Sequence, residues 1–200
     1  MALPRTTVMD GLASSMISFE TLLRALDQGA WDTASRCEGW TVGDVARHAI
    51  GSMADAVAGR TDGLGSPEAT QREVEERAGR SPVELADECA EVAKAAAGVL
   101  PLFDDDSWSA PAPGGYDGTL GDGIEALWSD FWIHADDVRA GAGLPSVADD
   151  GLAGAVSHVT FELGKRGWKG QVPDGDDQVA WVLSATGRAP LQDGLVNIYA

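Results

Sequence analysis

Apolar residues recur every three or four positions along most of this chain, a spacing that gathers them on one face of an α-helix. Between Thr7 and Asp27 the stripe consists of Met9, Leu12, Met16, Phe19, Leu23 and Leu26. Such stripes and helix-start signals predict helices over residues 7–27, 41–59, 66–79, 81–100, 120–140, 149–163 and 177–186. Because a helix with one apolar face must bury that face against another element, the chain is constrained to a packed assembly of helices.

Local start signals support two of these helices. Thr41 and Asp44 have the spacing of a capping box, in which each side chain hydrogen-bonds the backbone N–H of the other. Ser81 is followed by a proline suited to the first helical turn and then by Glu84. Residues 102–118 are rich in Asp, Pro and Gly, which predicts a long surface loop.

No internal repeat, low-complexity tract or confident β-hairpin interrupts this series. We predict an all-α fold, most simply an up-and-down four-helix bundle over residues 1–145. Residues 146–200 are expected to form a short helical C-terminal extension that packs on the bundle. The 44% hydrophobic content and seven tryptophans are sufficient for the core of one such domain.

The charge balance and the cysteines narrow the possible partners. A net charge of −18 opposes binding to nucleic-acid phosphates and to anionic membranes. The sequence shows neither a signal-peptide pattern nor an apolar run of about 18 residues, so we expect a cytoplasmic protein, monomeric or homodimeric, that acts on a small molecule. Cys37 and Cys89 are expected to be reduced, and Cys37 is interpreted as structural or incidental because no His or Lys lies near it in sequence.

Two of the three histidines lie on predicted helices in positions suited to metal binding. Asp130 and His134 are four residues apart, so their side chains project from one helix face. His48, on another helix, could complete a set of two imidazoles and one carboxylate that leaves a coordination position open. Zn²⁺ suits these donors best, and Ni²⁺, Co²⁺ or Fe²⁺ would accept them. Spacing alone leaves open the alternative that these are hydrogen-bonded or surface histidines.

Other polar residues could support this site. Asp44, Asp136 and Asp137 are available to hold a ligating imidazole through its second nitrogen. Asp137 is the strongest of these candidates, whereas Asp136 is better explained as part of a solvated acidic face. His158 is interpreted as structural. Arg188 follows a Thr-Gly pair near a helix end, where it would either satisfy the terminal carbonyl groups or bind a substrate carboxylate through two hydrogen bonds.

Three segments of the sequence carry more information than the spacing of the histidines alone. They are Cys-Glu-Gly-Trp-Thr-Val-Gly-Asp-Val-Ala-Arg-His over residues 37–48, Asp-x-x-x-His-x-x-Asp-Val-Arg-Ala-Gly-Ala-Gly over residues 130–143, and Thr-Gly-Arg over residues 186–188. Together they resemble the DinB-like superfamily, and within it the mycothiol-dependent maleylpyruvate isomerase family of actinobacteria. The resemblance spans about residues 8–190.

This resemblance implies a four-helix bundle that binds a divalent metal, usually zinc, at the positions of His48, Asp130 and His134. It implies that the metal activates the thiol of mycothiol, or of another low-molecular-weight thiol, for attack on an electrophile. The expected function is a thiol S-transferase or isomerase acting on a small electrophilic substrate, with His48 and Arg188 as candidate catalytic residues.

The sequence departs from the family pattern at two places, and two other functions stay open. Asp130 stands where the isomerase branch usually has Glu, and the C-terminal part is short and helical where the isomerase has an α/β domain. The alternatives are a metal-dependent hydrolase that uses the same site, and a non-catalytic ligand-binding bundle that has lost its metal.

Overall fold

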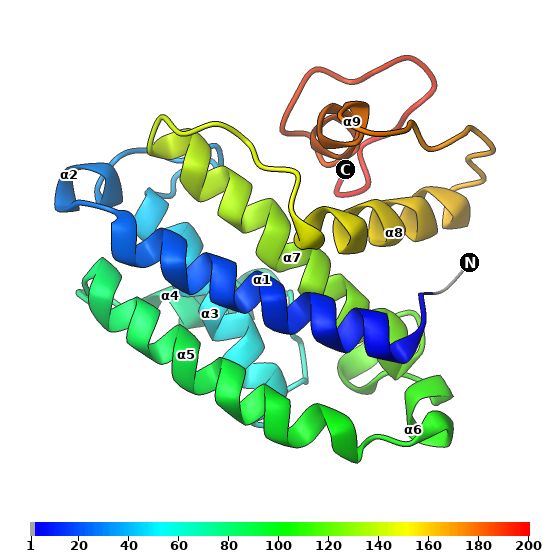
Figure 1. The fold of residues 1–200 in the computed structure, drawn as a ribbon, viewed down its shortest axis with the longest axis horizontal. Helices are drawn as coiled ribbons and strands as arrows, with labels where there is room; N and C mark the ends of the chain where they lie inside the picture. The colour runs from blue at the N-terminus through cyan, green and yellow to red at the C-terminus, as the bar shows by residue number, and fades with distance from the viewer. Residues whose placement is uncertain (1–2) are drawn as a thin grey trace.

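The computed structural model describes residues 3–200, which form helices joined by loops (Figure 1). The helices are α1 (Arg5–Ala25), α2 (Gln28–Trp31), α3 (Val42–Val57), α4 (Pro67–Glu75), α5 (Pro82–Val99), α6 (Asp105–Ser109), α7 (Leu120–Gly141), α8 (Asp150–Lys165) and α9 (Asp177–Ala185). Two 3-10 helices, η1 (Leu100–Leu102) and η2 (Pro113–Gly115), flank α6. Extended pairing in residues 3–200 is limited to two isolated bridges, so the predicted all-α fold is confirmed.

The four long helices α1, α3, α5 and α7 form a bundle in which α1 and α3 each pack against both α5 and α7 (Figure 1). Their directions differ from the simple alternation that we predicted. The Trp128 indole donates a hydrogen bond to Ser15 Oγ, and one turn later on α1, Phe19 packs on Phe131 of α7. The contacts advance in the same direction along both helices, so α1 and α7 run parallel. Helices α3 and α5 are also parallel, because α4 returns the chain along α3 to the end at which α3 begins. There Arg47, on the second turn of α3, donates a hydrogen bond to the backbone carbonyl of Arg80, just before α5.

Capping boxes fix the starts of the helices that matter for the site. The predicted boxes of Thr41 with Asp44 and of Ser81 with Glu84 both form. A third box at Thr119 starts α7. Each box satisfies backbone N–H groups that the first turn leaves without helical partners, so the positions at which α3 and α7 begin are well defined.

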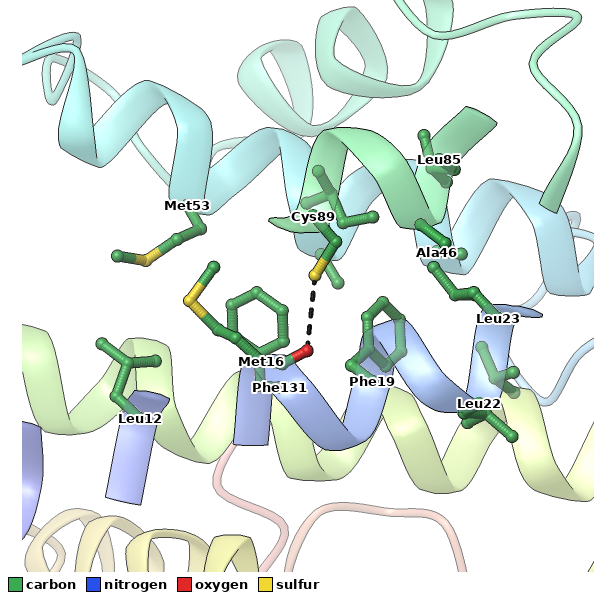
Figure 2. Packing of buried hydrophobic residues seen from close by; sticks show 14 of the residues in the cluster. Leu12, Met16, Phe19, Leu22, Leu23, Ala46, Met53, Leu85, Cys89 and Phe131 are labelled. Carbon is green, nitrogen blue, oxygen red and sulfur yellow. Dashed lines mark hydrogen bonds between the residues drawn. The ribbon is translucent and has the colours of Figure 1, made fainter. Parts of the chain in front are cut away.

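The bundle core is made of interdigitating apolar side chains, several of which Figure 2 shows in contact between helices. The rings of Phe19 and Phe131 meet edge to face, with centroids 5.6 Å apart. The Cys89 thiol lies within this core, 3.5 Å from the Met16 carbonyl oxygen, and burial raises the pKa of Cys89 to about 12. Cys89 therefore acts as a small apolar core residue and not as a nucleophile.

Helix α7 contributes to a second core on its outer side. Trp132 and Ile133 pack there against α8, α9 and the C-terminal tail, where they meet Leu163, Trp181 and Ile198. Helix α8 also contacts α1. The residues after α7 are thus attached to the bundle by a shared helix and by a continuous apolar layer.

Two short helices were not predicted. The first long helix ends at Ala25, and Asp27 then accepts a hydrogen bond from the backbone N–H of Ala30, which starts α2 as a separate turn. The segment 102–118, predicted as loop, contains α6, whose first turn is capped by Asp104. In the part of the chain that the structure describes, none of the helices is both long enough and apolar enough to cross a membrane.

Candidate metal centre

His48 lies on the second turn of α3, between α4 and α7. Its Nδ1 atom is 2.7 Å from Oε2 of Glu73, a fully buried carboxylate on α4. The Trp40 indole packs against the imidazole, with ring centroids 5.4 Å apart. The ring is thereby held by a carboxylate at one nitrogen and by an aromatic neighbour, and its Nε2 atom faces α7.

Asp130 and His134 lie one turn apart on α7, as their spacing predicted. Oδ1 of Asp130 is 3.2 Å from Nε2 of His134. The other ring nitrogen of His134, Nδ1, is 3.1 Å from Oδ2 of the buried Asp137. The His134 side chain is 9% exposed and that of Asp130 is 30% exposed, so the cluster opens to solvent on the Asp130 side.

The donor atoms of His48, Asp130 and His134 converge. His48 Nε2 is 3.9 Å from Asp130 Oδ2, and the two imidazole centroids are 5.0 Å apart. One ligand atom from each residue lies within 4.8 Å of the others. Ligands at about 2.1 Å from a tetrahedral zinc ion are separated by about 3.4 Å, so small side-chain movements would bring these atoms to coordinating distance. The residues fit a divalent metal of this type.

The charges in the cluster reinforce one another. Burial alone would raise the pKa of Asp130, but the adjacent His134 outweighs burial and holds that pKa at about 2. Burial also opposes protonation of His134, yet the carboxylates of Asp130 and Asp137 raise its pKa well above the usual value. A bound cation would replace the proton of His134, because a ligating imidazole must be neutral.

Asp137 links this cluster to the C-terminal extension. Arg188 donates from Nε to Oδ1 at 2.9 Å and from Nη2 to Oδ2 at 2.7 Å, and Arg36 approaches Oδ1 with its Nε at 3.2 Å. Burial alone would raise the pKa of Asp137, but the hydrogen bonds from His134 and Arg188 outweigh this effect and hold the pKa well below its usual range. Arg188 also donates to the Thr186 carbonyl at 3.1 Å, so its guanidinium serves both Asp137 and the end of α9.

One prediction about a neighbouring residue is wrong. Asp136 is only 3% exposed and pairs with Arg36, so it does not belong to a solvated face. Cys37 has no histidine near it in sequence but lies near one in space, because its Sγ atom is 3.6 Å from Oδ2 of Asp137 and belongs to a cluster with His134. The segment before α3 folds over the end of α7, a contact between residues 100 positions apart that neighbours in sequence cannot reveal.

Cys37, His134 and Asp137 form a second group whose ligand atoms lie within 4.8 Å of one another. The guanidinium groups of Arg36 and Arg188 both contact Asp137, and their positive charge opposes a cation at that place. The group formed by His48, Asp130 and His134 is therefore the candidate metal centre.

The sequence reasoning missed Glu73, because α4 has a polar composition. The signal that could have found it is that Glu73 follows Ala69 by one turn, and both are buried on the face of α4 that meets the bundle. Asp44, considered as a partner for an imidazole, instead caps α3 and pairs with Arg47. His158 is buried, burial lowers its pKa, and it lies outside the donor group.

The fold and the site together define the class as an all-α helical-bundle protein with a candidate metal centre, formed by a His, Asp and His group across two of its helices. Residues 12–139 match the family model described as the mycothiol maleylpyruvate isomerase N-terminal domain. This match covers more than half of the chain, and the protein belongs to that family.

Solved structures agree with this assignment. A crystal structure of the mycothiol-dependent maleylpyruvate isomerase is similar with a TM-score of 0.61 and 18% identity, over 94% of this chain and 90% of that chain. A crystal structure of a histidine-to-alanine mutant gives a TM-score of 0.62 and 19% identity over the same shares. At this identity the likeness establishes the shared fold, and its coverage extends through the C-terminal extension. Among curated proteins, none matches the chain.

Proposed function

We propose that this protein is a metal-dependent enzyme that uses a low-molecular-weight thiol, with mycothiol as the first candidate, to transfer or isomerise a small electrophilic substrate. The observation that carries the proposal is the convergence of His48, Asp130 and His134, with a buried carboxylate on the Nδ1 atom of each imidazole. This arrangement leaves both Nε2 atoms directed at one point beside the carboxylate of Asp130. Family membership supports the same function.

A zinc ion held by these three residues would supply one kind of chemistry, since coordination favours the deprotonated form of a bound thiol or water near neutral pH. The chain's own groups organise that site. Glu73 and Asp137 accept from the two Nδ1–H groups and thus set the tautomers of His48 and His134. Arg188 donates two hydrogen bonds to the carboxylate of Asp137 and so holds it in place, and we propose this as the principal role of Arg188.

The solvent-exposed side of Asp130 is where a thiol and an electrophile would reach the site. Addition of a thiolate sulfur to a double bond activated by a carbonyl group would form a C–S bond and move the π electron pair onto the carbonyl as an enolate, which leaves a single bond about which the substrate can rotate. Return of that electron pair would break the C–S bond, restore the double bond and release the thiolate unchanged. Isomerisation by this route consumes no thiol, whereas transfer retains it in the product.

The first test is the metal content of natively purified protein. We expect close to one divalent ion per chain, and its loss in both His48→Ala and His134→Ala. His158→Gln is the matched control, because it changes the one histidine outside the donor group and should retain the ion. Stoichiometric metal in both alanine variants would contradict the proposed ligands.

The second test separates the candidate reactions. The metal-loaded protein is incubated with an electrophile that has an activated double bond, in the presence and absence of mycothiol. Conversion that requires the thiol supports the proposal. Turnover without thiol would indicate the hydrolase alternative, and the absence of conversion under both conditions would indicate a non-catalytic bundle.

A further inference from the structure

Glu73 of α4 contacts His48 through only one of its two carboxylate oxygens. Its side chain is fully buried, and Oε2 lies 2.7 Å from Nδ1 of His48. Its second oxygen, Oε1, is buried and has no hydrogen-bond partner among the described residues. Burial of a carboxylate with one unpaired oxygen is costly, so this placement calls for a compensating interaction.

The packing of α4 against α3 explains how this carboxylate reaches the imidazole. Gly51 lies one turn after His48, on the face of α3 that meets α4. A Cβ atom at position 51 would lie 2.6 Å from Cβ of Glu73, so only glycine permits this approach. Helix α4 is also anchored to α3 by the ion pair of Arg72 with the buried Asp55. The close approach of α4 to the α3 backbone at Gly51 therefore shapes the site, in addition to the side-chain contacts.

Among the described residues, the carboxylate of Glu73 forms no ion pair with an arginine or lysine, and its partner is the imidazole of His48. The guanidinium of Arg77 donates instead to the backbone carbonyl of Glu73 and pairs with Glu88. Asp137, which has the corresponding position beside His134, is bound by Arg188 instead. The two imidazoles thus differ, because one is backed by a compensated carboxylate and the other by an uncompensated one.

We propose that Glu73 is a positioning residue of the metal centre, which orients His48 through Nδ1 and supplies the second negative charge that balances a divalent ion. The inference rests on the metal site of the proposed function. Asp130 provides one negative charge at the donor group, Asp137 is offset by Arg188, and Glu73 provides the other through His48. A purely structural Glu73 would stabilise the fold equally with and without metal.

The experiment measures Zn²⁺ affinity by competition with a chromogenic chelator, on the full-length protein after removal of metal. The variants are Glu73→Gln, which keeps the volume and an acceptor oxygen but loses the charge, and Glu73→Ala, which loses both. Glu75→Gln is the matched control, because Glu75 lies on the same helix and is exposed. We expect Glu73→Gln and Glu73→Ala to bind Zn²⁺ about 10- to 100-fold more weakly, and Glu75→Gln to match the wild type.

Thermal unfolding in EDTA provides the readout for structure. Glu73→Gln should retain the helical circular dichroism of the wild type, so that its loss of affinity cannot be attributed to unfolding. If Glu73→Ala does not fold, the isosteric Glu73→Gln alone decides the question. Affinities within twofold of the wild type in the folded variants overturn the role of Glu73 and leave the metal site intact. A wild type that binds no Zn²⁺ overturns the proposed function itself, together with this inference.

Discussion

Asp130 joins the two imidazoles, because its Oδ1 atom faces His134 and its Oδ2 atom faces His48. The aspartate arm is one methylene shorter than that of a glutamate, yet its two oxygens lie 3.2 Å and 3.9 Å from the Nε2 atoms of His134 and His48. A short carboxylate is therefore compatible with a divalent metal at this site.

Replacement of Asp130 by Asn tests the importance of its charge. The amide keeps the shape and one oxygen donor, but it no longer provides the negative charge that attracts a divalent ion. We expect Asp130→Asn to weaken Zn²⁺ binding by roughly tenfold or more, on the scale of the loss of a ligating charge. Metal content after dialysis against a weak chelator measures this, and full occupancy in the variant would show that Asp130 is not a ligand.

The three candidate donor residues and the partner of His134, Asp137, could be predicted from sequence, but Glu73 and Cys37 could not. The four-residue spacing of Asp130 and His134 places both on one helix face whatever the rest of the fold. Glu73 contacts His48 across 25 positions of sequence, and Cys37 contacts Asp137 across 100 positions, in both cases between different elements. In the sequence, such residues look like polar surface residues. They contribute to the site because they are buried, and their burial is known only from the folded chain.

At the level of elements, the metal centre depends on how closely α4 approaches α3. Gly51 is the contact that sets this distance, because any Cβ there would collide with the side chain of Glu73. Helix α4 is short, and its two buried residues, Ala69 and Glu73, lie one turn apart on the face that meets the bundle.

We expect Gly51→Ala to displace α4 and to weaken both the metal affinity and the fold. Overpacking of this kind costs about 1–3 kcal/mol. Gly98→Ala is the control, since Gly98 lies within α5 and a Cβ there meets no atom within 4 Å. Chemical denaturation and Zn²⁺ titration measure the two effects, and a Gly51→Ala protein that matches Gly98→Ala in both would refute the close-approach argument.

The helices themselves were largely predictable, and their directions were not. Apolar periodicity and capping boxes act within one helix, and the ends of α3, α5 and α7 lie within two residues of the predicted ones. The parallel arrangement of α3 with α5 depends on where α4 packs. That packing is decided by Gly51, His48 and Asp55 together, which no local pattern in α4 specifies.

At the scale of the whole molecule, α7 belongs to both cores and carries two of the three candidate metal ligands. Phe131 faces the bundle, Trp132 and Ile133 face α8 and α9, and Asp130 and His134 lie between these surfaces. Asp137 connects the same helix to Arg188 in the C-terminal extension. Unfolding of either part would expose the apolar surface of the other, so the two should unfold together.

This coupling predicts one cooperative thermal transition whose midpoint rises when metal binds. At a free Zn²⁺ concentration of about 100 times Kd, binding to the folded state stabilises it by about 2.7 kcal/mol. For a chain of this size that corresponds to an increase in Tm of roughly 5–10 °C. Circular dichroism and tryptophan fluorescence, recorded with Zn²⁺ and with EDTA, should give coincident curves under each condition. Because Trp132 and Trp181 report on the second core and Trp31 and Trp128 on the first, two separate transitions would show that the C-terminal extension folds independently, and an unchanged Tm would show that the folded state holds no metal.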